Sequence, residues 1–220
     1  MQTKTLTIMF VDLVEYTKKA SSTTRDKFIE HLDTYKSIAK PIFPKYHGHI
    51  VKEIGDAYMV SFESPTNAVL CGIYLQNSIA KHNQDMPKEN KLHVKVAINT
   101  GEVHLKEGDV YGDAVNIASR LEKLTKPDRI YFTESVFLSM NKNEVSVGFV
   151  GAEKFKGIPH KINIYTVLGK YELILKKLRK KQKRFTRTLS LVLTVLLMFV
   201  LLGVIIGLIV FLALNQGTLF

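Results

Sequence analysis

Two aspartates stand at positions where apolar stretches of the chain end. Asp12 directly follows the mostly apolar residues 6–11, and Asp56 follows Gly55 in a short turn between two apolar segments. Carboxylates that converge from neighbouring strands can bridge two Mg²⁺ or Mn²⁺ ions, because these hard cations prefer oxygen ligands and substrate phosphates. An aspartate is also a common turn former, so the pair taken alone leaves both interpretations open.

A second polar pair is spaced as on a helix. Asn116 and Arg120 are four residues apart, so they share one face of an expected helix over residues 112–125, and apolar residues form another face. A guanidinium suits a negatively charged phosphoryl group, and an amide can hold a sugar. An ordinary surface helix has the same pattern, so this spacing alone does not decide between a site and a solvated face.

The elements that must position these residues follow the order β-α-β-β-α-β. This is the split βαβ order of ferredoxin-like folds, which predicts an α+β domain. Hydrophobic spacing and turn residues predict strands over residues 6–11, 49–54, 57–62, 92–99, 130–133, 145–150 and 162–168, and helices over residues 24–46, 64–79 and 112–125.

Four separate segments resemble, in order, the motifs of class III nucleotidyl cyclases. They are FVDLVEYT at 10–17, VKEIGDAYM at 51–59, NTGEV at 99–103 and VYGDAVNIASRLE at 110–122. The resemblance spans about residues 5–168. It implies a ferredoxin-like cyclase catalytic core within a domain over residues 1–168, and a reaction that cyclises a nucleoside triphosphate.

The resemblance also implies roles for the two polar pairs. Asp12 and Asp56 match the family's metal-binding aspartates, which hold two Mg²⁺ or Mn²⁺ ions per active site. Asn116 and Arg120 match a pair that acts on the transition state. The expected reaction is attack of the ribose 3′-oxygen on the α-phosphorus with loss of pyrophosphate, in which one metal lowers the pKa of the 3′-hydroxyl and the other holds the triphosphate.

The residues that match the family's base-reading positions favour ATP as substrate. Lys52 and Asp109 fall on the Lys and Asp that adenylate cyclases use. An ammonium suits the acceptor N1 of adenine and a carboxylate suits its 6-amino group, whereas guanine reverses both groups. Lys156, in Phe-Lys-Gly, is the nearest candidate for a further phosphate-binding lysine.

In this family the active site lies between two catalytic domains, which implies a homodimer with shared sites. The metal ligands would come from one chain, and Lys52, Asp109, Asn116 and Arg120 from the other. The chain departs from the family at Glu15, where a Gly in Gly-Phe-Thr usually approaches phosphate, and at Asn99, where a His is frequent before Thr-Gly.

The C-terminal part has a different composition. Residues 189–214 form a run of 26 residues without charge, long enough to cross a bilayer as a helix, and a short tail follows at 215–220. Residues 169–188 carry nine Lys or Arg and one Glu. The whole chain has a net charge of +11, so the catalytic domain has a net charge of only +3. The charge therefore argues against nucleic-acid binding. The uncharged run and the basic segment beside it predict a single-pass membrane protein with a basic juxtamembrane segment and a cytoplasmic catalytic domain.

Two other functions compete with an active adenylate cyclase. One is a catalytically silent cyclase-like domain that binds nucleotide for signalling, which Glu15 favours slightly and the six matching site residues oppose. The other is a guanylate cyclase, which Lys52 and Asp109 disfavour.

Overall fold

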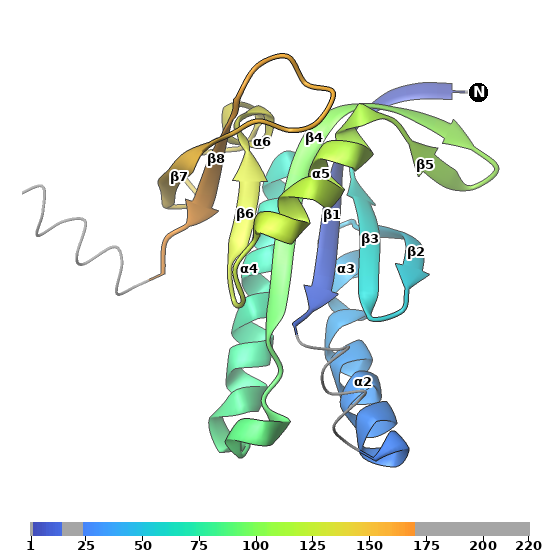
Figure 1. Ribbon diagram of the computed structural model, residues 1–220, viewed down its shortest axis with the longest axis vertical. Helices are drawn as coiled ribbons and strands as arrows, with labels where there is room; N and C mark the ends of the chain where they lie inside the picture. The colour runs from blue at the N-terminus through green and yellow to red at the C-terminus, as the bar shows by residue number, and fades with distance from the viewer. Residues whose placement is uncertain (1, 15–23, 170–220) are drawn as a thin grey trace, which may run out of the picture. The chain divides into compact units, whose positions relative to one another are not determined.

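The structure is a computed structural model that describes residues 2–14 and 24–169 (Figure 1). The chain divides into two compact units, Met1–Leu168 and Gly169–Phe220. Glu15 and everything after Gly169, including the expected basic segment, membrane span and tail, lie outside the described residues. Within the described ranges, no helix is long and apolar enough to cross a membrane.

The first unit contains helices and strands in the predicted β-α-β-β-α-β order, followed by a β-α-β-α-β-β extension. The elements are β1 (Gln2–Leu13), α2 (Arg25–Ala39), α3 (Ile42–Lys45), β2 (His49–Ile54), β3 (Ala57–Phe62), α4 (Pro65–His82), β4 (Val94–Lys106), β5 (Asp109–Tyr111), α5 (Asp113–Leu124), β6 (Ile130–Thr133), α6 (Glu134–Ser139), β7 (Val147–Glu153) and β8 (Ile162–Val167), with short 3₁₀ turns at Asn83–Asp85 and Lys88–Asn90.

The strands form one sheet in the order β2-β3-β1-β4-β6-β8-β7, and β5 pairs with the end of β4. All pairings are antiparallel except that of β4 with β6. The first four strands of this order, β2, β3, β1 and β4, have the arrangement expected from the split βαβ pattern. β1 and β4 are adjacent, near the middle of the whole sheet. The mixed α+β fold class is therefore confirmed.

The alternation of side chains along β1 assigns the two faces of the sheet. Met9 and Val11 belong to the larger core cluster, which includes residues of α2, α3 and α4. Ile8 and Phe10 belong to a second cluster, beneath Ala114 and Ala118 of α5. Figure 1 shows α5 in front of β1 and β4, with α2 and α4 on the opposite face. Asp12 has the same parity as Ile8 and Phe10, so its side chain is on the α5 face.

The helix expected over residues 24–46 is divided in two. α2 ends at Ala39 and α3 begins at Ile42, with Pro41 between them. A proline has no N–H for the helical ladder, and its ring clashes with the preceding turn, so a continuous helix stops there. The helix expected from residue 64 is confirmed and begins as predicted, since the Ser64 hydroxyl accepts a hydrogen bond from the Asn67 N–H at 3.3 Å.

The strand expected over residues 92–99 continues to Lys106 and turns back into β5. The turn residues Glu107 and Gly108 both have positive φ, of 52° and 79°. Such a pair matches a tight hairpin turn, and the glycine adopts this conformation without a side-chain clash. Neither this hairpin nor α6 was predicted from the sequence. The hairpin matters for function because it carries Asp109.

Candidate active site

The structure brings the two predicted metal aspartates together. Asp12 lies within β1, one residue before its end, and Asp56 lies in the turn between β2 and β3, which is next to β1 in the sheet. Burial raises the pKa of Asp56 to about 6, and the nearby negative charge of Asp12 adds to this shift. The two carboxyl groups are thus close enough to repel one another, and a cation between them would relieve the repulsion.

A lysine and a glutamate that the sequence analysis missed complete this cluster. Lys95 lies directly opposite Asp12 in the β1–β4 register, and its Nζ is 2.8 Å from Asp12 Oδ2. The same ammonium contacts the Glu122 carboxylate, from α5. Burial alone would lower the pKa of Lys95, but its hydrogen bonds to Asp12 and Glu122 outweigh burial and raise it. A lysine inside the apolar strand segment Val94–Ile98 was the sequence signal that could have found it.

This carboxylate pair fits hard divalent cations. Its ligand atoms are carboxylate oxygens, and Asp56 is poorly solvated and held next to the charge of Asp12. Among residues 2–14 and 24–169, no group of three or more His, Cys, Asp or Glu side chains could hold a metal ion. Asp12 and Asp56 would therefore need water and substrate phosphates as further ligands, which is how Mg²⁺ commonly binds.

The two predicted base-reading residues form a direct ion pair. Lys52 Nζ is 2.7 Å from Asp109 Oδ2, although the two residues come from different hairpins. The hydrogen bond from Lys52 is the largest cause that lowers the pKa of Asp109, followed by one from Tyr111. The Lys52 ammonium also lies 5.8 Å from the centre of the Tyr111 ring. Both charged groups remain partly exposed, which leaves them accessible to a ligand.

The predicted transition-state residues are on α5, as the helical spacing indicated. Ala114, Ala118 and Leu121 are buried against the sheet, whereas Asn116 is exposed. The Arg120 guanidinium donates a hydrogen bond to the backbone carbonyl of Lys156. The structure therefore places Lys156, which the motif alignment suggested only loosely, beside Arg120.

Within one chain, the Asp12–Asp56 pair and Arg120 lie on different sides of α5. Asp12 and Asp56 are at β1 and the β2–β3 turn, whereas Arg120 contacts the 154–161 segment that leads into β8. Phe155 of that segment packs with Leu121 and Ile164 beyond β4, on the β6–β8 side of the sheet. Within one chain, Arg120 is thus held at the segment before β8, whereas the carboxylate pair lies at β1 and the β2–β3 turn.

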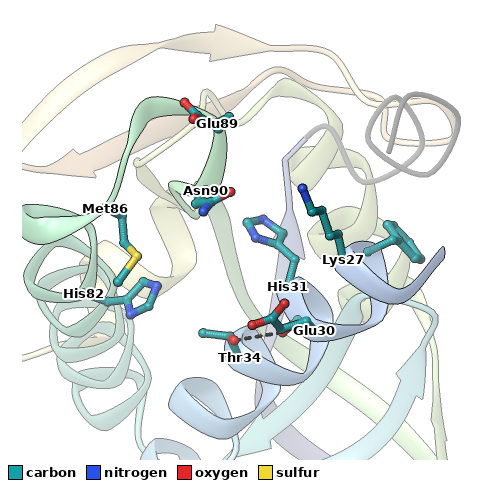
Figure 2. A pocket seen from close by; sticks show the side chains of 9 residues that line it. Lys27, Glu30, His31, Thr34, His82, Met86, Glu89 and Asn90 are labelled. Atoms are coloured by element: carbon teal, nitrogen blue, oxygen red, sulfur yellow. Dashed lines mark hydrogen bonds between the residues drawn. The ribbon is translucent and has the colours of Figure 1, made fainter. Parts of the chain in front are cut away.

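Two hollows in the described part of the chain differ in their distance from the candidate site residues: one lies beside Asp109, and the other contains none of them. A groove of about 770 Å³ runs along the sheet beside Asp109, with apolar walls formed by Leu6, Val51 and Leu105. A smaller hollow of about 290 Å³ lies between α2 and the segment after α4. Figure 2 shows that hollow, with His31 on one wall and His82 on the other. None of the predicted site residues lines the hollow in Figure 2, whereas Asp109 lines the larger groove.

The motif residues, their placement on this sheet and the strand order agree with one family. Residues 1–169 match the model of the adenylate and guanylate cyclase catalytic domain. The chain belongs to this family. A solved adenylate/guanylate cyclase/hydrolase from Silicibacter pomeroyi superimposes on this cyclase domain with a TM-score of 0.69 and 25% identity, covering 77% of this chain and 99% of that one.

Two curated relatives are much longer than the segment that this chain matches in them. The serine/threonine-protein kinase pkn2 of Myxococcus xanthus is 31% identical over 160 residues, which cover 73% of this chain and 19% of the kinase. The putative adenylate cyclase 3 of Rhizobium meliloti is 27% identical over 161 residues, covering 72% of this chain and 27% of that protein. The chain thus spans less than a third of either relative, and the likeness concerns the cyclase domain.

Proposed function

We propose that this chain is an adenylate cyclase that converts ATP to 3′,5′-cyclic AMP and pyrophosphate. The observation that carries the proposal is the Lys52–Asp109 pair, with Nζ and Oδ2 at 2.7 Å, on the same domain as the facing carboxylates Asp12 and Asp56. The first pair offers adenine a donor and an acceptor, and the second offers cations two carboxylates. Membership of the cyclase family supports this reading of both pairs.

The reaction makes one bond and breaks one bond at phosphorus. The ribose 3′-oxygen bonds to the α-phosphorus, the bond from that phosphorus to its bridging oxygen breaks, and pyrophosphate leaves with the electron pair while the hydroxyl proton passes to solvent. Asp12 and Asp56 would hold two Mg²⁺ or Mn²⁺ ions, which would supply Lewis-acid stabilisation to the 3′-oxygen and the triphosphate. Arg120 donates to the charged phosphoryl oxygens and Asn116 orients the ribose, so catalysis consists of positioning and electrostatics.

The choice of ATP over GTP follows from hydrogen-bond polarity. The Lys52 ammonium has three N–H donors and the Asp109 carboxylate has several lone pairs, so each can keep the other and still bind the base. Adenine N1 accepts from Lys52, and the 6-amino group donates to Asp109. Guanine presents an N–H and a carbonyl at these two positions, which sets donor against donor and acceptor against acceptor.

A second copy of the chain would complete the site. In one chain, Arg120 contacts the segment before β8 rather than the carboxylate pair, and the groove beside Asp109 has partly buried apolar walls. Ile54 and Tyr111, at the two hairpins next to this groove, are 53% and 49% exposed. A homodimer in which these surfaces face the partner would bury them and bring Asn116 and Arg120 of one chain to Asp12 and Asp56 of the other.

We also propose that the chain is anchored in a membrane by residues 189–214, with the catalytic domain on the cytoplasmic side. The uncharged run and the adjoining basic segment support this placement. Alkaline extraction of membranes tests it, because an integral span stays in the pellet whereas a peripheral protein is released. A full chain found in the released fraction would contradict the anchor.

A product assay tests the proposed activity. The purified full chain is incubated with Mn²⁺ and either ATP or GTP, and cyclic nucleotides are quantified by mass spectrometry. We expect cyclic AMP from ATP, with cyclic GMP from GTP at least roughly 10-fold lower, and no product from Asp12→Asn in either reaction. Product formation from neither nucleotide would indicate a silent domain, and a preference for GTP would indicate a guanylate cyclase.

A further inference from the structure

Asn99 lies at the junction of the central strand with the helix that carries Asn116 and Arg120. It is 3% exposed, and its Nδ2 donates to the backbone carbonyl of Ala114, in the first turn of α5, at 2.9 Å. Its Oδ1 accepts from the hydroxyl of Thr133 at 2.7 Å and from that of Ser135 at 3.1 Å. The Ala114 carbonyl can only accept a hydrogen bond, so the NH₂ group of Asn99 must face it, and this sets the orientation of the Asn99 amide.

The backbone around this amide is closely fitted. A Cβ at Gly101 would lie 3.1 Å from Ala114 Cβ, and a Cβ at Gly112 would lie 3.2 Å from the carbonyl oxygen of Glu102. The first turn of α5 therefore rests directly on β4. The amide of Asn99 is the polar contact at this point, and through Thr133 and Ser135 it also reaches the end of β6 and the start of α6.

We propose that Asn99 is a positioning residue for cyclisation: it holds the first turn of α5 at the height that places Asn116 and Arg120 for the substrate. The proposal rests on the proposed function. Ala114 precedes Asn116 by two residues, so a shift of the first turn moves the Asn116 side chain directly. Errors of about 1 Å in the position of a catalytic group can lower a rate about 100-fold.

The residue types at position 99 make the role testable. In Asn99→Asp, the carboxylate still accepts from Thr133 and Ser135 but opposes the Ala114 carbonyl. Asn99→Ala removes the bond to the Ala114 carbonyl together with those from Thr133 and Ser135, but it buries no charge, which covers the case in which the aspartate variant does not fold. Asn99→His restores one donor and one acceptor, and a hollow of about 410 Å³ beside Asn99 and Ala114 leaves room for the ring.

The matched control is Thr125→Val, at the other end of the same helix. The Thr125 hydroxyl donates to the Leu121 carbonyl at 2.8 Å, and Thr125 is 4% exposed, so burial and bond length resemble those at Asn99. A merely structural role for Asn99 predicts that both positions affect the enzyme through stability alone. A positioning role predicts that only Asn99 affects turnover of the folded protein.

Four measurements are made on the full chain: kcat, KM for ATP, Mn²⁺ affinity, and amide hydrogen exchange in α5. For Asn99→Ala and Asn99→Asp we expect kcat to fall by about 10-fold or more with KM nearly unchanged, together with faster exchange in the first turn of α5. Mn²⁺ affinity should stay as in the wild type, because Asp12 and Asp56 are on other elements. Asn99→His should recover most of kcat, and Thr125→Val should keep it.

Several results would overturn the proposal. Unchanged exchange in the first turn of α5 would show that Asn99 does not hold the helix. A loss carried by KM, or an equal loss of kcat in Thr125→Val, would show a structural role instead. These results with an active wild type would leave the proposed function intact, whereas a wild-type chain without cyclase activity would overturn both.

Discussion

At the scale of single residues, the candidate site is defined by charges that lie close together without full solvation. Asp12 and Asp56 repel each other, and the Lys95 ammonium is bonded to Asp12 and Glu122 on the same face of the sheet. Lys52 and Asp109, in contrast, form a neutralised pair. The cluster around Asp12 and Asp56 thus favours an added positive charge. The Lys52–Asp109 pair offers a hydrogen-bond donor beside an acceptor, as the proposed reading of a base requires.

The raised pKa of Asp56 predicts a pH-dependent gain in stability on mutation. Because the folded-state pKa of about 6 exceeds the ordinary value of 3.8, ionised Asp56 destabilises the metal-free fold. The penalty is absent below the ordinary pKa, grows as the pH rises between the two values, and is complete above the folded pKa. Asp56→Asn should therefore stabilise the metal-free chain at about pH 7.5 by about 1 kcal/mol, a figure reduced for solvent screening.

Urea unfolding in the presence of a chelator measures this difference, and it should vanish at about pH 4. Added Mg²⁺ should stabilise the wild type more than the variant, because only the wild type keeps both carboxylates. A variant that is less stable than the wild type at both pH values would contradict the electrostatic account of Asp56.

The base-reading pair predicts a change of substrate preference. In Lys52→Glu combined with Asp109→Cys, N1 of adenine, which is an acceptor, would face the new carboxylate, which is also an acceptor. Guanine can instead donate its N1–H to this carboxylate. We expect the ratio of kcat/KM for ATP to that for GTP to fall by about 10-fold or more. Steady-state assays with both nucleotides measure the ratio, and Lys142→Glu, at an exposed lysine after α6 that contacts the Leu138 carbonyl, serves as a charge control. An unchanged ratio would remove these residues from base recognition.

At the scale of elements, α5 links the parts of the site. Its buried residues fit β1 and β4, Glu122 reaches the cluster at Lys95, and Arg120 reaches the 154–161 segment. The β4–β5 hairpin brings Asp109 to Lys52 across the groove. The orientation of α5 is set where it begins, because the chain passes from β5 to the helix through a single glycine.

Gly112 is the position at which this orientation is most sensitive. Its φ is 132°, and an added Cβ would lie 3.2 Å from the Glu102 carbonyl oxygen and 3.4 Å from the Val103 Cα. Gly112→Ala should therefore lower the free energy of unfolding by about 1–3 kcal/mol. Gly151→Ala is the control, since nothing lies within 4 Å of a Cβ there. Equal stabilities of the two variants in urea unfolding would contradict the strain at Gly112.

At the scale of the whole molecule, the proposed dimer explains why one chain holds its catalytic groups apart. Arg120 is fixed on the β8 side of α5, and the carboxylate pair is fixed at β1 and the β2–β3 turn. Two copies related by a two-fold axis would form two equivalent sites, each with metal ligands from one chain and transition-state residues from the other.

Complementation between two inactive variants tests this arrangement. Asp56→Ala and Asn116→Ala homodimers should both be nearly inactive, because each site lacks one group. A mixed dimer collects both lesions in one site and none in the other, so random 1:1 mixing should restore roughly a quarter of wild-type activity. The variants are co-expressed with different tags and the unfractionated mixture is assayed; the mixed dimer is then isolated by both tags, and it should show about half of wild-type activity. A purified mixed dimer without activity would argue against shared sites.

By itself, the sequence determined the α+β class, most element positions and the family, because these depend on local patterns. The spacing of Asn116 and Arg120 assigned them to one helix, and Asp12 and Asp56 stood where apolar segments end, which left a metal site and simple turn residues both open. Pro41 was a local signal for dividing the first helix, but the apolar spacing on the N-terminal side of it favoured one continuous helix. The continuation of β4 into a hairpin was not predicted, since the polar and apolar residues there fit several structures.

Only the tertiary structure decided which distant residues meet. Lys95 faces Asp12 because the β1–β4 register aligns them, and a shift of one residue would turn either side chain to the other face. Asn99 reaches α5 because the helix rests on β4 beside Gly101. Arg120 meets Lys156 for the same kind of reason, since the segment before β8 packs under the helix. Register and packing are set by the whole core, so no local stretch of the sequence contains them.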